Sequence, residues 1–283
     1  MIEPKSTTTA ELFDRYEGVL IDVYGVLLDA AGPLPGAFAL MAELHRRAMP
    51  YAIVTNDASR SPATYSARFA RHGIAISEER FITAGGLLPG YFRDRGLVGA
   101  RTCVLGTADS VAFVRAGGGV PIKLTPGVDL DVLAICDDDG FDFLPTVEAA
   151  ATALLRMVAA GRRPTVVLAN PDLIYPKGEG EIGFTAGSIA LLIAAAFARR
   201  FPSYGLVIDQ LGKPQPFLFS AASRLLGIAP HRLVMIGDQI ETDVAGAQAA
   251  GIDAALLTGI SDWHHAQATT SVAPQWLIDT LSP

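Results

Sequence analysis

The sequence has few cysteines, no strongly basic stretch and no long hydrophobic run, and each shortage excludes a class of protein. Its 283 residues include two cysteines, Cys103 and Cys136, which have neither CxxC spacing nor a matching histidine cluster. We expect both to be reduced structural thiols, as is usual for a cytoplasmic protein. The net charge is −7 and no basic cluster is present, so neither nucleic acid nor an anionic membrane is expected as the main partner.

Hydrophobic segments are present but short. The longest apolar run, residues 189–198, is rich in alanine and well below the about 20 residues that span a bilayer, so we expect a buried helix there. Residues 1–11 are polar and carry no apolar signal segment. Half of all residues are hydrophobic and 18% are charged, which predicts a folded protein with a large core. A homo-oligomer is as compatible with this composition as a monomer.

Short apolar runs alternate with helical patterns along the whole chain, which predicts βαβ units and a mostly parallel sheet. We expect strands at residues 19–22, 51–55, 102–106, 132–136, 165–169, 206–209, 233–238 and 254–258. We expect helices at residues 36–48, 61–72, 147–160, 187–201, 214–226 and 243–250. The predicted fold class is α/β, with a Rossmann-like parallel-sheet core.

The long middle stretch has its own rhythm of strands and helices, which indicates an inserted second domain. We expect a core domain at residues 1–82 plus 170–283, and an inserted α/β domain at residues 83–169. The proline- and glycine-rich segment 170–178, at the exit from the insertion, is expected to be a hinge or loop rather than a strand.

Carboxylates follow two of the expected strands, at opposite ends of the sequence. Asp22 follows the apolar run 19–21, and Asp238 follows the run 233–236, with Asp243 five residues later. Because ligands bind at the carboxyl ends of strands in a parallel sheet, we expect these side chains to meet there. Carboxylate oxygens are the ligands that hard cations prefer, so the pattern predicts a Mg²⁺ site.

A phosphate group at such a site needs positive charge nearby. Three carboxylates and a phosphate dianion carry about five negative charges, which Mg²⁺ and the ammonium of Lys213 reduce to about two. Backbone N–H groups near Gly25 and Asn56 offset more of the charge. A carboxylate can then attack phosphorus and form an acyl-phosphate, which divides one difficult step into two easier ones.

Five motifs carry a resemblance to a known family. They are residues 22–27 (DVYGVL), 54–60 (VTNDASR), 170–172 (NPD), 212–214 (GKP) and 237–243 (GDQIETD). In this order the sequence resembles the haloacid dehalogenase (HAD) superfamily of phosphohydrolases. The large insertion is similar to the capped subclass IIA, which includes sugar-phosphate, nitrophenylphosphate and pyridoxal-phosphate phosphatases. The resemblance implies a C2-type cap and Mg²⁺-dependent hydrolysis of a small phosphorylated metabolite through an aspartyl-phosphate.

The resemblance also implies roles for individual residues. Asp22 matches the nucleophile and Lys213 the charge-neutralising lysine. Asp238 matches a direct metal ligand and Asp243 the outer carboxylate that holds the metal's waters, while the backbone carbonyl of Tyr24 would also bind the metal. The phosphate- or substrate-binding candidates are Gly25, Thr55, Asn56, Asp172 and Lys213. For Asp172 an alternative is that it only fixes the hinge.

Tyr24 departs from the family pattern, which has an aspartate two residues after the nucleophile. That aspartate protonates the leaving oxygen and then activates water, whereas a phenol is a poor base near pH 7. The protein is therefore expected to be a slow phosphatase. A metal-independent haloacid dehalogenase, whose opening motif is similar, is one alternative, and a non-enzymatic protein that binds a phosphorylated ligand is another. The acidic run 137–139 is either a solvated turn or a substrate-selecting loop.

Overall fold

The chain folds into two compact units. The computed structural model describes residues 3–29, 31–125, 127–178, 181–258 and 271–282. The first unit comprises Met1–Thr55, Pro62–Ile82 and Lys213–Pro283, and the second comprises Asn56–Ser61 and Thr83–Gly212. Residues 170–212 therefore pack with the inserted stretch. The expected domain boundary at residue 170 stays a prediction.

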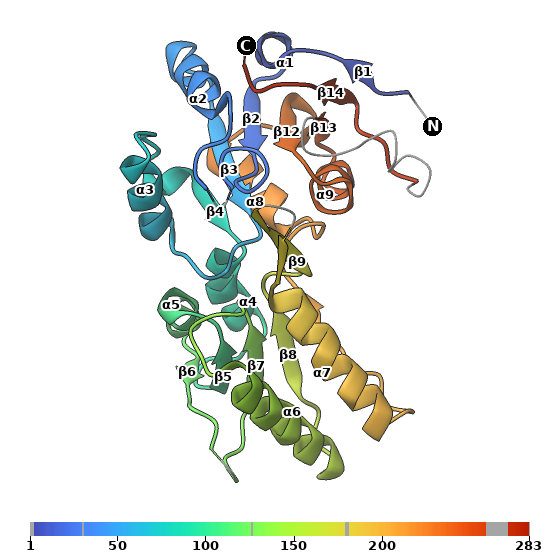
Figure 1. Ribbon diagram of the computed structural model, residues 1–283. Helices are drawn as coiled ribbons and strands as arrows, with labels where there is room; N and C mark the ends of the chain where they lie inside the picture. The colour runs from blue at the N-terminus through green and yellow to red at the C-terminus, as the bar shows by residue number, and fades with distance from the viewer. Residues whose placement is uncertain (1–2, 30, 126, 179–180, 259–270, 283) are drawn as a thin grey trace. The chain divides into compact units, whose positions relative to one another are not determined.

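The first unit is built on a seven-stranded sheet in the order β1-β14-β13-β12-β2-β3-β4 (Figure 1). Its strands are β1 (Lys5–Ser6), β2 (Gly18–Ile21), β3 (Tyr51–Thr55), β4 (Phe81–Thr83), β12 (Leu233–Gly237), β13 (Asp253–Leu257) and β14 (Trp276–Ile278). Its helices are α1 (Thr9–Arg15), α2 (Ala37–Arg46), α3 (Pro62–Arg71), α8 (Phe217–Leu226) and α9 (Ala245–Ala249). Strand β2 runs parallel to both β3 and β12. All residues of these three strands are buried, as expected where helices cover both faces of a parallel sheet.

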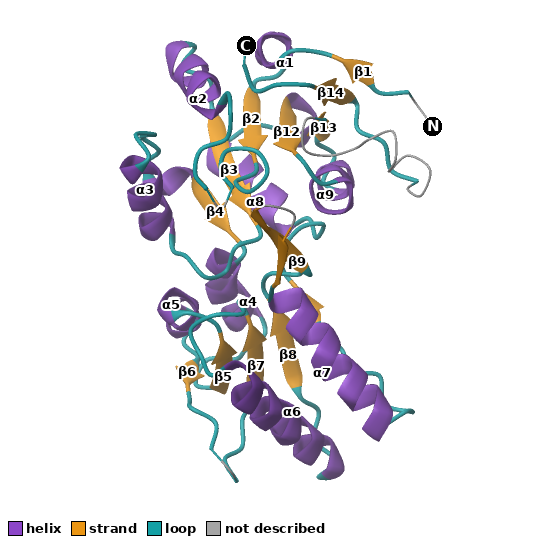
Figure 2. Cartoon of the chain, viewed as in Figure 1, coloured by secondary structure: helices purple, strands orange, loops and turns teal. Residues whose placement is uncertain are grey.

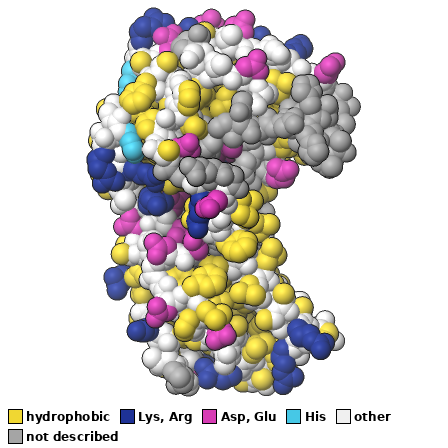
Figure 3. Space-filling model, viewed as in Figure 1, with side chains coloured by type: hydrophobic (Ala, Val, Ile, Leu, Met, Phe, Trp, Pro, Cys, Tyr) yellow, Lys and Arg dark blue, Asp and Glu magenta, His cyan; other side chains and the backbone are white. Residues whose placement is uncertain are grey.

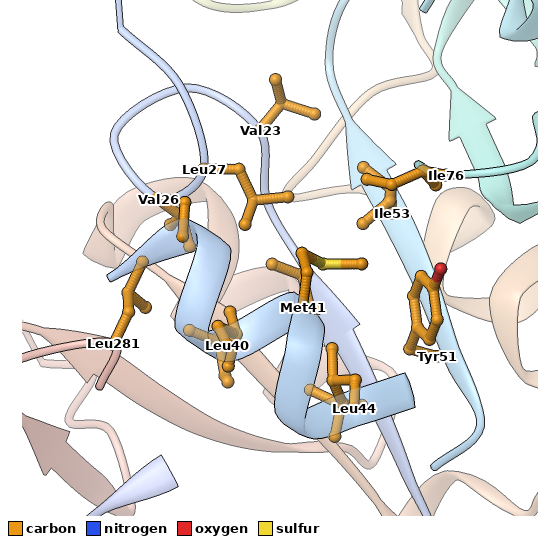
Figure 4. Close-up of a cluster of buried hydrophobic side chains, with 14 of the residues drawn as sticks. Val23, Val26, Leu27, Leu40, Met41, Leu44, Tyr51, Ile53, Ile76 and Leu281 are labelled. Carbon is orange, nitrogen blue, oxygen red and sulfur yellow. The ribbon is translucent and has the colours of Figure 1, made fainter. Parts of the chain in front are cut away.

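Helix α2 shows how the apolar pattern builds this core. Its buried residues Leu40, Met41 and Leu44 recur at helical spacing and so lie on one face. Figure 4 shows these side chains directed toward residues of β3 and of the loop after β2, among them Val26 and Ile53. The packing holds the loop that follows β2 against the sheet.

The second unit has a five-stranded parallel sheet in the order β11-β8-β7-β5-β6 (Figure 2). Its strands are β5 (Arg101–Leu105), β6 (Val120–Pro121), β7 (Val132–Ile135), β8 (Thr165–Leu168) and β11 (Asp209–Gln210), with a separate hairpin of β9 (Ile174–Gly178) and β10 (Glu181–Phe184). Its helices are α4 (Leu88–Asp94), α5 (Ala108–Ala116), α6 (Phe143–Ala159) and α7 (Ala186–Arg200). Alternate residues of β7 point to opposite faces, where Leu133 packs with α6 and α7 and Ala134 packs with α4 and α5.

The expected α/β class with a parallel-sheet core is confirmed, and two local expectations are wrong. A strand was expected at residues 206–209, but the strand found there, β11, begins only at Asp209. Leu206 and Ile208 lie in the preceding loop, and their apolar side chains pack against the core. The segment 170–178 contains β9 rather than only a loop. Pro176 is tolerated there because a two-stranded hairpin consists of edge strands.

No helix in the described part of the chain is long and apolar enough to cross a membrane.

Truncation of the α2 core face gives a direct test of this packing. We expect Leu40→Ala to lower the free energy of unfolding by about 2–5 kcal/mol, since Leu40 is fully buried. Phe38→Ala on the same helix is the control, because Phe38 is 53% exposed and should lose about 1 kcal/mol or less. Urea unfolding followed by circular dichroism measures both values. Similar losses for the two variants would contradict the assigned helix face.

Candidate active site

The register of the first sheet brings two carboxylates to one edge. Ile21 at the end of β2 pairs with Ile236 near the end of β12, and the backbone N–H of Asp22 donates to the carbonyl of Ile236 (3.0 Å). Asp238 directly follows β12 on the neighbouring strand. The expectation that both carboxylates leave the same edge of the sheet therefore holds in the structure.

Lys213 lies between two carboxylates. Its Nζ is 2.7 Å from Asp22 Oδ1 and 2.7 Å from Asp243 Oδ1, and it also donates to the carbonyl of Val54 (3.2 Å). The side chain is 2% exposed. Because an ammonium group removed from water needs hydrogen-bonded partners of opposite charge, this arrangement fixes the position of all three charged groups.

Asp243 is positioned by an unusual turn. After β12 the chain makes a single π-helical turn, Ile240–Val244, of the kind that often marks functional sites. The turn returns Asp243 toward the start of the segment, where its Oδ2 accepts from the backbone N–H groups of Asp238 and Gln239 (both 3.2 Å). One oxygen of Asp243 thus binds the backbone and the other binds Lys213.

The same residues form a cradle for a divalent cation. Carboxylate oxygens of Asp22, Asp238 and Asp243 lie within 4.8 Å of one another, the one such group of three among the described residues. Asp238 Oδ1 is buried and has no hydrogen-bond partner. Gly25 has φ +81°, and a Cβ placed there would lie 2.1 Å from Asp238 Oδ2, so only glycine allows the loop to approach so closely.

The charges of this cluster do not balance without a cation. Three carboxylates and one ammonium leave two negative charges, which one divalent ion neutralises. Burial raises the pKa of Asp22 to about 7, with attraction to Lys213 lowering it and repulsion from Asp243 raising it. Burial and repulsion from Asp243 and Asp22 also raise the pKa of Asp238 well above its usual range. For Lys213, burial lowers the pKa, but attraction to Asp22 and Asp243 outweighs it and the net shift is upward.

The remaining candidates of the first unit line the same edge. Thr55 ends β3, next to β2, and is 2% exposed. Tyr24 lies in the turn after Asp22, partly buried against the core. Arg68 on α3 donates from Nη1 to Tyr24 Oη (2.6 Å), and its guanidinium lies 5.5 Å from the ring centroid of Tyr24. No sequence signal links the two, since they are 44 residues apart.

Asn56 and Asp172 belong to the second unit. There the amide Nδ2 of Asn56 donates to Asp172 Oδ1 (2.8 Å), while the backbone N–H of Asp172 donates to Asn170 Oδ1 (3.0 Å). The carboxylate of Asp172 thus holds the amide of Asn56, and whether it contacts substrate or only fixes the loop stays a prediction. Gly212 packs against Asn56 and Pro171, and a Cβ placed there would lie 2.6 Å from Asn56 Oδ1.

The acidic run 137–139 is only partly solvated. Burial, followed by repulsion from the buried Asp57, raises the pKa of Asp137 to about 6. Asp57 itself accepts from Ser59 and pairs with Arg60 (2.7 Å). Sequence reasoning did not single out Asp57, although its place inside the segment 54–60 was visible.

The sequence is similar to known families and proteins along most of its length. Residues 19–119 match the model of the haloacid dehalogenase-like hydrolases, and residues 210–283 match a second HAD-hydrolase-like model. Rat chronophin is 30% identical over 291 residues, which cover 96% of this chain and 88% of that protein. This chain belongs to the HAD hydrolases. Dihydroxyacetone phosphatase of Corynebacterium glutamicum is 28% identical over 244 residues, covering 86% of this chain and 82% of that enzyme.

Solved structures of HAD phosphatases share the fold. A possible sugar phosphatase from Cytophaga hutchinsonii has a TM-score of 0.86 at 25% identity and covers 99% of both chains. The p-nitrophenyl phosphatase from Archaeoglobus fulgidus has a TM-score of 0.74 at 22% identity, covering 94% of this chain and 97% of that one. The resemblance to subclass IIA and the expectation of a phosphatase-type hydrolase are thereby confirmed.

The raised carboxyl pKa values of this HAD hydrolase give a pH-dependent stability. A carboxyl whose pKa is near 4 when unfolded and about 7 when folded holds its proton longer in the folded state. In metal-free buffer, stability is therefore lost as the pH rises from about 4 to 7. We expect the thermal midpoint to fall over this window, and to fall less in Asp238→Asn, whose amide does not ionise.

The exposed Asp94 supplies the control, because Asp94→Asn should keep the wild-type dependence. Differential scanning fluorimetry in chelator at closely spaced pH values measures all three proteins. Equal pH dependence in the wild type and Asp238→Asn would contradict the claim that repulsion among the buried carboxylates causes the loss of stability.

Proposed function

We propose that this protein is a Mg²⁺-dependent phosphomonoesterase that acts on a small phosphorylated metabolite through an aspartyl-phosphate on Asp22. The observation that carries the proposal is the buried cluster in which Lys213 Nζ lies 2.7 Å from both Asp22 and Asp243. Relatives named dihydroxyacetone phosphatase and acid sugar phosphatase support the reaction class. They also favour an enzyme over a non-enzymatic protein that binds a phosphorylated ligand.

Asp22 is suited to act as the nucleophile. Its Oδ1 is held by Lys213, so the carboxylate has a fixed orientation at the carboxyl edge of the sheet. In the first step a carboxylate oxygen attacks phosphorus, the bond to the leaving oxygen breaks, and a mixed anhydride forms on Asp22. In the second step water attacks phosphorus, and Asp22 is released with inorganic phosphate.

The residues present fit a Mg²⁺ ion. Asp22, Asp238 and the backbone carbonyl of Tyr24 would hold it directly, and Asp243 would hold its waters. The unpartnered oxygen of Asp238 and the close approach of Gly25 are the features expected of a site built for a small, hard cation. When bound, the ion stabilises negative charge that develops on the phosphoryl oxygens.

Substrate contacts are proposed for several further residues. The hydroxyl of Thr55 and the backbone N–H groups near Gly25 are placed to bind the phosphate, and Lys213 adds positive charge. Asn56, oriented by Asp172, is proposed as a further polar contact. We place the enzyme in the cytoplasm, because Cys103 and Cys136 are both free and buried.

Tyr24 is proposed to act as the proton donor in place of the family's aspartate. Arg68 donates its hydrogen bond to the phenol oxygen, so the phenol O–H proton is directed elsewhere and is available for the leaving oxygen. The positive charge of Arg68 stabilises the phenolate that remains. That phenolate then takes a proton from the attacking water, which restores the phenol.

A metal-independent haloacid dehalogenase is less compatible with the cluster. Such an enzyme would leave two uncompensated negative charges among buried carboxylates, at a high desolvation cost. Halide release from 2-haloacids in chelator is the result that would favour this alternative.

The nucleophile is tested by Asp22→Asn, which keeps the shape of the side chain and removes its charge. We expect at least about a 10⁴-fold loss of kcat on p-nitrophenyl phosphate, and loss of wild-type turnover in EDTA with recovery on added Mg²⁺. The exposed Asp94→Asn is the matched control and should keep full activity. More than about 1% residual activity in Asp22→Asn, or full wild-type activity in EDTA, would refute the mechanism.

The role of Arg68 is tested by comparing substrates whose leaving groups do and do not need a proton. Arg68→Gln should lower kcat on an alkyl phosphate by about 10-fold or more, within the range that proton transfer supplies. Hydrolysis of p-nitrophenyl phosphate should change less, because nitrophenolate leaves without a proton and only the attack of water on the aspartyl-phosphate still uses Tyr24. Tyr24→Phe should give the same pattern, and the double variant should lose no more than either single one.

Arg71→Gln is the control for this test, since Arg71 is an exposed cation on the same helix. It should behave as the wild type on both substrates. If Arg68→Gln lowered both rates equally, Arg68 would serve the structure of the loop and not the proton donor.

A further inference from the structure

A cavity opens on the first unit at the amino-terminal end of β3, away from the candidate metal site. Its volume is about 500 Å³, and its wall includes Tyr51, the first residue of β3. Thr55, the last residue of β3, lies at the other end of the strand, near the edge that carries Asp22. Because each residue of a strand adds about 3.3 Å, the two ends are about 13 Å apart. The cavity is therefore separate from the proposed catalytic residues.

Three segments of the first unit surround this cavity, which we call the Arg80 cavity. They are the last turn of α2, one side of α3 and the segment 75–80 that precedes β4. Tyr51 and Ile76 in its wall belong to the buried core of the first unit (Figure 4), so this part of the wall is well packed. Ala70 and Ala75 add apolar surface. Sites for small organic molecules have volumes of about 300–1,000 Å³ and mostly apolar walls, so the cavity is large enough for a metabolite.

Arg80 supplies the positive charge of the cavity and is held in place. Its Nη1 donates to the carbonyl of Tyr51 (3.2 Å), and its guanidinium lies 5.2 Å from the ring centroid of Tyr51. None of the carboxylates in the described part of the chain forms an ion pair with it. A guanidinium has five N–H donors in a planar fork that matches a carboxylate or a phosphate. Arg80 is thus oriented by the protein and keeps donors for an external anion.

The charge around the cavity is positive. The neighbouring Glu79 is held by Ser77, whose Oγ donates to Glu79 Oε1 (2.6 Å). Residues 37–55 and 62–80, which supply the wall, contain five arginines and three glutamates but no aspartate or lysine. Figure 3 shows arginine or lysine side chains close to a histidine on the flank of the first unit where α3 lies. In a protein whose net charge is −7, this local excess of positive charge favours the approach of an anion.

Two serines of the wall offer hydrogen-bond acceptors. Ser66 Oγ donates its proton to a backbone carbonyl (2.7 Å), and Ser77 Oγ donates to Glu79. Each hydroxyl oxygen keeps lone pairs that accept from a ligand. A ligand with an anionic group at Arg80 and a hydroxyl or amine elsewhere therefore matches the wall.

We propose that the Arg80 cavity binds a small organic anion, at a site separate from the one around Asp22. The carboxylate or phosphate group of this ligand pairs with the remaining N–H groups of Arg80, and its carbon skeleton lies against Ala70 and Ala75. A hydroxyl or amine on the skeleton donates to Ser66. An inorganic ion alone would fill little of a cavity of about 500 Å³, so the natural ligand is an organic acid or a phosphate ester.

The anion contact is tested by titration of the whole protein, labelled with ¹³C in its histidine rings, with malonate or inorganic phosphate. His45 is the reporter, because it lines the cavity and its Nε2 lies 3.2 Å from Tyr51 Oη. Its signal, identified by its loss in His45→Gln, should shift saturably at neutral pH and constant ionic strength, with a dissociation constant on the order of 1 mM. Malonamide, the uncharged analogue of malonate, should leave the signal unchanged. The anion that binds more tightly identifies the ligand as a carboxylate or a phosphate ester.

Two pairs of variants locate the binding. Arg80→Gln should raise the dissociation constant at least about 10-fold, whereas Arg71→Gln, an exposed arginine of α3 outside the cavity wall, should bind as the wild type does. Ala70→Phe fills the cavity without touching Arg80 and should weaken binding to a similar extent. Ala67→Phe, exposed on the same helix but outside the wall, is its control. Circular dichroism should show the same folded state for all four variants.

The readout is binding at His45, so the result does not depend on the phosphatase reaction proposed for Asp22. Three results would each overturn the proposal. The first is a His45 signal that neither anion shifts, and the second is an equal shift with malonamide. The third is wild-type binding in both Arg80→Gln and Ala70→Phe.

Discussion

The position of one buried ammonium group determines the arrangement of the active-site edge. Lys213 has almost no contact with water, and its charge is stable there only because Asp22 and Asp243 lie within hydrogen-bond distance. Removal of both carboxylates would leave the buried ammonium without an ionic partner. The same three groups hold together segments from both ends of the chain, so charge neutralisation and tertiary structure are coupled.

The sheet supplies the frame for this interaction. Strands β2, β3 and β12 are parallel neighbours, and their shared direction brings Asp22, Thr55 and Asp238 to one edge without any special loop. Only Asp243 needs an exceptional backbone, the π-helical turn that directs its carboxylate back to the cluster. Most of the site thus follows from ordinary topology, and one turn completes it.

Much of the fold and of the site was predictable because the relevant signals are local or carried by motifs. Buried parallel strands appear as short apolar runs, and the carboxylates that follow 19–21 and 233–236 indicated where their ends lie. The contact between Arg68 and Tyr24 was not predictable, since it depends on how α3 packs against a loop far away in sequence. The hairpin of β9 and β10 was missed because proline and glycine in segment 170–178 usually indicate a loop.

The left-handed conformation of Gly25 separates two properties of the loop after β2. Its φ of +81° and its contact with Asp238 fix the path of the backbone, whatever side chain stands at position 24. A different side chain at position 24 therefore need not move the carbonyl proposed to bind the metal. A phenol in place of a carboxylate changes the proton chemistry that the side chain offers, while the backbone atoms keep their place, so the two roles proposed for residue 24 are separable.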